Sequence, residues 1–76
     1  MVPNDALVNA LRSLKFEFKQ QTDRVMIYKQ RGTARRVGLR RRDYHDEGAV
    51  REALKLAGMP QAEIDAFIAS AKTGKH

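Results

Sequence analysis

Eight basic side chains and no acidic one lie between positions 24 and 42, and they carry the clearest chemistry of this chain. Seven of the eight are arginines, whose planar guanidinium matches phosphate and stacks on flat rings. Val25 and Ile27, then Val37 and Leu39, alternate with the charges, which is typical of folded strands rather than of a disordered basic tail. A folded basic surface favours nucleic acid as the partner. The eight residues are Arg24, Lys29, Arg31, Arg35, Arg36, Arg40, Arg41 and Arg42.

Histidine titrates near neutral pH, and the chain has two histidines, His45 and His76. His45 lies between Asp43-Tyr44 and Asp46, where carboxylates are able to tune a catalytic acid or base. The same residues are typical of a helix cap with His45 on the surface, and we prefer that interpretation to His45 as a catalytic residue. Because cysteine is absent and the histidines are far apart in sequence, we expect no metal site and no cofactor.

The elements that must position these residues follow from the apolar spacing. Leucines at 7, 11 and 14 predict a helix, and Gly32 predicts the turn of a hairpin. Gly58 and Pro60 mark the end of one later helix and the start of the next. The expected elements are a helix at about 5–14, strands at about 15–19, 24–29 and 34–41, a helix capped by His45 or Asp46 that ends near Ala57, and a helix from Pro60 to about Ala71.

The order α-β-β-β-α-α predicts an α+β fold with two layers, in which helices cover one face of a three-stranded antiparallel sheet. We expect a single domain of residues 1–71 and a flexible tail of residues 72–76. The predicted core consists of Leu7, Leu11, Leu14, Phe16, Phe18, Val25, Ile27, Val37, Leu39, Val50, Leu54, Ile64, Phe67 and Ile68.

If those strand residues face the helices, their neighbours face solvent. That open face would present Lys15, Glu17, Lys19, Arg24, Met26, Tyr28, Arg36, Gly38, Arg40 and Arg42. A shift of one residue would instead bury Met26 and Tyr28 and expose Val25 and Ile27. We expect the basic groups to bind phosphates and Tyr28 to stack on a base. The predicted nucleic-acid-binding residues are Arg24, Tyr28, Lys29, Arg31, Arg36, Arg40, Arg41 and Arg42.

Three stretches of the chain form a further pattern: Leu-Lys-Phe-Glu-Phe at 14–18, Arg-Val-Gly-Leu at 36–39 and a helix ending in Ala-Gly-Met at 57–59. Through these motifs, the chain from about residue 5 to 68 resembles the HicA-type toxins of toxin–antitoxin pairs, which have a fold like the double-stranded-RNA-binding domain. The resemblance implies an mRNA-cleaving ribonuclease with a histidine in a Gly-Ser-His motif at the start of the second strand. Arg24 stands there instead, and it does not release a proton under ordinary conditions.

We therefore predict a small, non-catalytic domain that binds RNA or DNA. One alternative is a module that docks on an acidic protein, such as an antitoxin or a host enzyme inhibited by a phage product. Others are a HicA-like mRNA interferase that uses His45, and a solvated face without function. No apolar run approaches the roughly 20 residues of a membrane span. The absence of cysteine fits a cytoplasmic protein, and we expect a monomer or a homodimer.

Overall fold

The computed structural model describes residues 1–72, in which three helices lie close to the positions that the apolar spacing predicted. Asp46 caps the second of them, because its Oδ1 accepts a hydrogen bond from the Ala49 N–H at 2.8 Å. Gly58 follows the same helix with a φ of +91°, the left-handed conformation that suits glycine after a helix. The helices are α1 (Asn4–Ser13), α2 (Glu47–Leu56) and α3 (Gln61–Ala71).

Three antiparallel strands form the main sheet in the order β2-β3-β4, which confirms the predicted α+β class. They are β2 (Phe16–Gln21), β3 (Val25–Gln30) and β4 (Arg36–Arg40). The sequence did not predict a second, two-stranded sheet, in which β1 (Val2–Pro3) pairs with β5 (Tyr44–His45). A strand of two residues has no alternation that a sequence pattern reveals.

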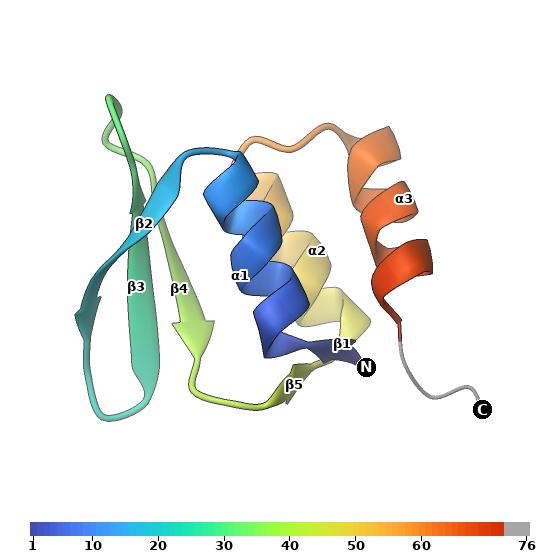
Figure 1. Cartoon of the computed structure of the whole chain (residues 1–76), viewed down its shortest axis with the longest axis horizontal. Coiled ribbons are helices and arrows are strands. Elements are labelled where there is room, and N and C mark those ends of the chain that lie inside the picture. Colours follow the sequence, from blue (N-terminus) through green and yellow to red (C-terminus); the bar gives the residue numbers. More distant parts are fainter. Residues whose placement is uncertain (73–76) are drawn as a thin grey trace.

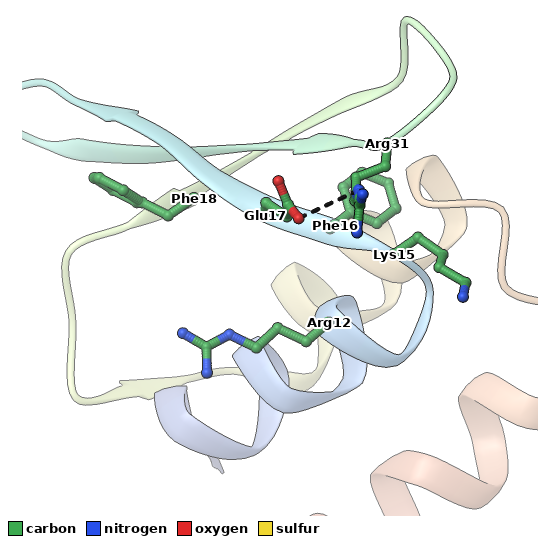
Figure 2. Close-up of a pocket in the computed structure, with 6 residues that line it drawn as sticks. All are labelled: Arg12, Lys15, Phe16, Glu17, Phe18 and Arg31. Carbon is green, nitrogen blue, oxygen red and sulfur yellow. Dashed lines mark ion pairs between the residues drawn. The ribbon is translucent and has the colours of Figure 1, made fainter.

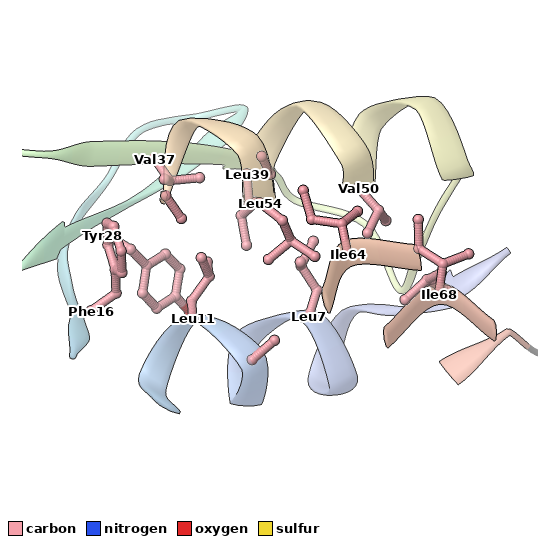
Figure 3. Packing of buried hydrophobic residues seen from close by; sticks show 14 residues of the cluster. Leu7, Leu11, Phe16, Tyr28, Val37, Leu39, Val50, Leu54, Ile64 and Ile68 are labelled. Atoms are coloured by element: carbon pink, nitrogen blue, oxygen red, sulfur yellow. The ribbon is translucent and has the colours of Figure 1, made fainter. Parts of the chain in front are cut away.

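Helices α1 and α2 pack on one face of the main sheet, and α3 lies outside them (Figure 1). Side chains from all three helices and the sheet meet in one core (Figure 3). Burying each large apolar side chain contributes about 1.5–3 kcal/mol. The largest fully buried ones are Phe16, Leu7, Leu11, Leu54, Ile64, Val2, Val37 and Val50. Apart from Lys72, the predicted flexible tail lies outside the described residues.

The register of β3 corrects part of the predicted core. Tyr28 pairs with Phe18 on one side and Val37 on the other, so all three point to the helix side of the sheet. Tyr28 is only 5% exposed, and the prediction that it faces solvent with Met26 is wrong. Because alternate residues point to opposite faces, Val25 and Ile27 lie on the open face, as the one-residue shift implies.

Three further residues of the predicted core are incompletely buried. Phe18 is 53% exposed because β2 is an edge strand and extends past the helices that cover Phe16. Leu14 and Phe67 are half-buried and pack against the margin of the core. The remaining nine predicted residues are buried.

Candidate nucleic-acid interface

The face of the sheet opposite the helices carries basic side chains at both ends of β4. Arg36 and Arg40 are exposed on this face, as predicted, and lie four residues apart, or about 13 Å along an extended strand. Lys29 of β3 pairs with Arg36 and with Glu17 of β2, which makes a row of three charged residues across the sheet. Pairing in the sheet therefore fixes where these charges project.

An apolar patch separates the two ends of this basic face. Val25 pairs with Arg40 and Ile27 pairs with Gly38, and both apolar side chains are half-buried. Val25 leans over Gly38 so closely that a Cβ on this glycine would lie 3.1 Å from Val25 Cγ1. The open face thus combines charge at its ends with hydrophobic surface at its centre, as the one-residue shift of β3 implies.

At one end of the sheet, the loops bring Arg24 and Arg41 together. The backbone N–H of Arg41 donates to the Arg24 carbonyl at 3.1 Å, and the Arg41 guanidinium donates to the Asp23 carbonyl at 3.4 Å. Arg42 follows directly, and all three arginines are exposed. This end therefore holds three of the predicted phosphate-binding side chains.

Arg31 and Arg35 lie at the other end, in the connection between β3 and β4, and their surroundings differ. Arg31 Nε is 3.4 Å from Glu17 Oε2, and both side chains are more than 60% exposed. Such an exposed pair contributes only about 0–1 kcal/mol, so Arg31 is readily drawn to a stronger anion. Arg35 instead donates to the Leu56 carbonyl at 3.5 Å, which places its charge at the C-terminus of α2.

Tyr28 does not belong to this surface, because it is buried between the sheet and the helices. The exposed aromatic ring of the sheet is that of Phe18, which contacts the Tyr28 ring at 5.8 Å between centroids and an interplanar angle of 74°. The alternation of Phe18 with Phe16 predicted that both residues lie in the core. A signal that could have separated them is the polar run Lys19-Gln20-Gln21, typical of a strand end that leaves the core.

His45 is buried rather than on the surface, and only 4% of it is exposed. Its Nε2 lies 2.9 Å from Asn4 Oδ1, so the neutral ring donates to the first residue of α1. Burial lowers the pKa of His45, and the positive charge of Arg42 lowers it further, against the opposing influence of Asp46. The neutral, hydrogen-bonded ring ties β5 to α1, which favours a structural role over acid–base catalysis.

Within residues 1–72, no group of three or more histidine or acidic side chains is placed to hold a metal ion. In the same part of the chain, no helix has the length and apolar character needed to cross a bilayer.

Comparisons with known proteins yield no match among protein-family models, curated proteins or solved structures.

Proposed function

We propose that this protein is a small, non-catalytic nucleic-acid-binding domain whose basic sheet face contacts phosphates. The observation that carries the proposal is that Lys29, Arg36 and Arg40 project from a sheet face opposite the helices, with Arg24, Arg41 and Arg42 at one end of it. Glu17 is the acidic side chain of that face, and it forms an exposed ion pair with Arg31 at 3.4 Å.

Rigid strands make this face better suited to phosphate than a flexible basic tail would be. The pairing of β4 with β3 holds the backbone of Arg36 and Arg40 at a fixed spacing, so fewer backbone rotations are lost on binding. The charge is also concentrated: residues 1–45 hold eleven basic against four acidic side chains, and residues 46–76 hold four against five. An oriented field of this kind speeds the approach of a polyanion.

The absence of a suitable catalytic group supports the non-catalytic part of the proposal. In the resemblance to HicA-type toxins, which the sequence alone suggests, Arg24 occupies the place of the family's histidine. Arg24 can stabilise the negative charge of a phosphate but does not remove a proton from a 2′-hydroxyl. His45 is buried and hydrogen-bonded to Asn4, which leaves it poorly placed to do so.

Fluorescence anisotropy with labelled single- and double-stranded RNA and DNA, at roughly 50 and 200 mM salt, tests the proposal. Six phosphate contacts would weaken binding by about 300-fold for a single strand and about 2,000-fold for B-DNA over this range. Absence of binding at the lower salt would refute the proposal.

Two controls address the alternatives. Polyglutamate that displaces the oligonucleotide at equal charge concentration would favour docking on an acidic protein. RNA recovered intact from the same mixtures would argue against the mRNA-interferase alternative, whereas cleavage that His45→Ala abolishes would support it.

A further inference from the structure

An exposed phenyl ring stands at the edge of the sheet, outside the basic face. Phe18 lies on the edge strand β2 and points to the helix side of the sheet, yet 53% of the residue is exposed. Its contact with the buried ring of Tyr28 holds it from one side. A large apolar ring that is held in place and half-open to solvent is suited to contact with another flat, apolar surface.

The ring borders a hollow of about 350 Å³ whose other walls are mainly cationic (Figure 2). Arg12 and Lys15 contribute from the end of α1 and the turn after it, and Arg31 contributes from the β3–β4 connection. Neither Arg12 nor Lys15 takes part in an ion pair among the described residues, whereas Glu17 on the same wall is paired with Arg31. The hollow therefore presents two uncompensated positive charges beside an aromatic ring.

The backbone around this hollow is held by hydrogen bonds. The Lys15 N–H donates to the Arg12 carbonyl at 2.9 Å, and the Lys15 carbonyl accepts from the Arg31 N–H at 2.9 Å. Lys15 itself has a φ of +74°, which is uncommon for a residue with a side chain and persists because these bonds fix it. The three cationic residues are thus tied to one another through their backbones.

This hollow is continuous with the basic sheet face. A second hollow, of about 190 Å³, shares Glu17, Phe18 and Arg31 with the first, and is also lined by Lys19 and Lys29. Lys29 belongs to the row that contains Arg36 on the open face. A chain of phosphates that crosses the open face can therefore continue around the edge of β2 to Phe18.

We propose that Phe18 stacks on an unpaired base while Arg12 and Lys15 contact the flanking phosphates, so that the ligand of the basic face is single-stranded nucleic acid. This inference rests on the proposed function and specifies its ligand. Bases within a duplex stack on each other and leave no face for Phe18, whereas an unpaired base offers both of its faces. The hollow exceeds the roughly 300 Å³ at which small-ligand sites begin, so it has room for one base.

The test compares wild-type protein, Phe18→Ala and the control Tyr44→Ala in binding to labelled 15-nucleotide oligouridine, oligothymidine and a 15-base-pair RNA duplex. The exposed fraction of Tyr44, 49%, is similar to that of Phe18, but Tyr44 lies outside both hollows. Loss of one stacked base should weaken binding of Phe18→Ala to the single strands by about 5- to 150-fold. Duplex binding, and all binding by Tyr44→Ala, should stay within about twofold of wild type.

Phe18→Trp provides a direct readout, because the chain has no tryptophan of its own. Stacking on a base should quench the emission of this single indole when oligothymidine is added at low salt, and the duplex should leave the emission unchanged. Far-ultraviolet circular dichroism of both Phe18 variants checks that the fold is retained.

The possible outcomes separate the two proposals. If wild-type protein binds single strands and Phe18→Ala binds them equally well, the stacking inference is overturned and the proposed function stands. If wild-type protein binds no nucleic acid, both are overturned. If Phe18→Ala loses as much affinity for the duplex as for the single strands, the single-strand preference is overturned. If the protein binds polyglutamate alone and this affinity depends on Phe18, the hollow is assigned to an acidic peptide.

Discussion

Replacing Arg36 and Arg40 together by alanine should change the salt dependence of binding, as well as its strength. Both side chains are exposed on β4, and no hydrogen bond or ion pair is found for either among the described residues. Their removal should therefore leave the free energy of unfolding within about 0.5 kcal/mol of wild type. If each side chain neutralises one phosphate, the negative slope of log K against log salt should become shallower by about 1.4 for a single strand and about 1.8 for B-DNA.

These slopes give a specific expectation for the ratio of the two affinities. Between roughly 50 and 200 mM salt, the advantage of wild type over the double variant should shrink by about 7-fold for a single strand and 12-fold for B-DNA. Anisotropy titrations at four or five salt concentrations measure both slopes. The matched control is Arg51→Ala with Lys55→Ala, which removes the same net charge from α2.

The plot of log K against log salt for the control variant should be parallel to that of wild type. Arg51 is paired with Asp65, and Lys55 lies on a helix that packs on the other face of the sheet. Parallel lines for wild type and the Arg36/Arg40 variant would refute the assignment of these two side chains to phosphates. A reduced slope in the control variant as well would show that overall charge, rather than the sheet face, determines binding.

Three further predictions concern the residues that hold this surface in place. Because the pKa of His45 is lowered from 6.5, the unfolded chain protonates first on acidification, so stability should fall below about pH 6.5; urea unfolding should show a weaker fall for His45→Gln, and equal pH dependence would contradict the reasoning. In thermal melts, Gly58→Ala should cost about 1–2 kcal/mol, because φ is +91°, a conformation that residues with a side chain rarely adopt. The new Cβ would also displace the flexible end of the Arg35 side chain, at little further cost. The control Gly48→Ala, whose Cβ would meet only Asp46 at 3.5 Å, should be neutral or stabilising in the same melts. Asp46→Ala should cost about 1 kcal/mol in these melts through loss of the cap on α2, and an unchanged midpoint would show that the cap contributes nothing.

The helices and β4 could be predicted from the sequence because each offers one consistent pattern. In β4, Val37 and Leu39 alternate with Arg36, Gly38 and Arg40, and the structure buries and exposes them in that order. In α2, apolar residues recur on one face and Gly58 ends the run. Where only one face of an element is apolar, the pattern has a single solution.

The register of β3 could not be predicted in this way, because Val25-Met26-Ile27-Tyr28 is apolar at both alternating sets of positions. Pairing with β4 makes the choice: the strand that contains Val37 and Leu39 places Tyr28 and Met26 opposite them, on the helix side. His45 was misplaced for a related reason. Its burial depends on β1, a strand of two residues more than forty positions away in sequence.

The observed register places the cations of the open face and the exposed aromatic ring on different parts of the surface. With Tyr28 buried, the open face has cations and aliphatic side chains but no aromatic ring, so its main attraction for a nucleic acid is to phosphates, which are the same for every base. The one exposed ring of the sheet, that of Phe18, lies around the edge of β2, and stacking on it tolerates any base. Neither contact reads hydrogen-bonding groups on a base edge. An interface built from these two contacts should therefore distinguish single from double strands far better than it distinguishes one base from another.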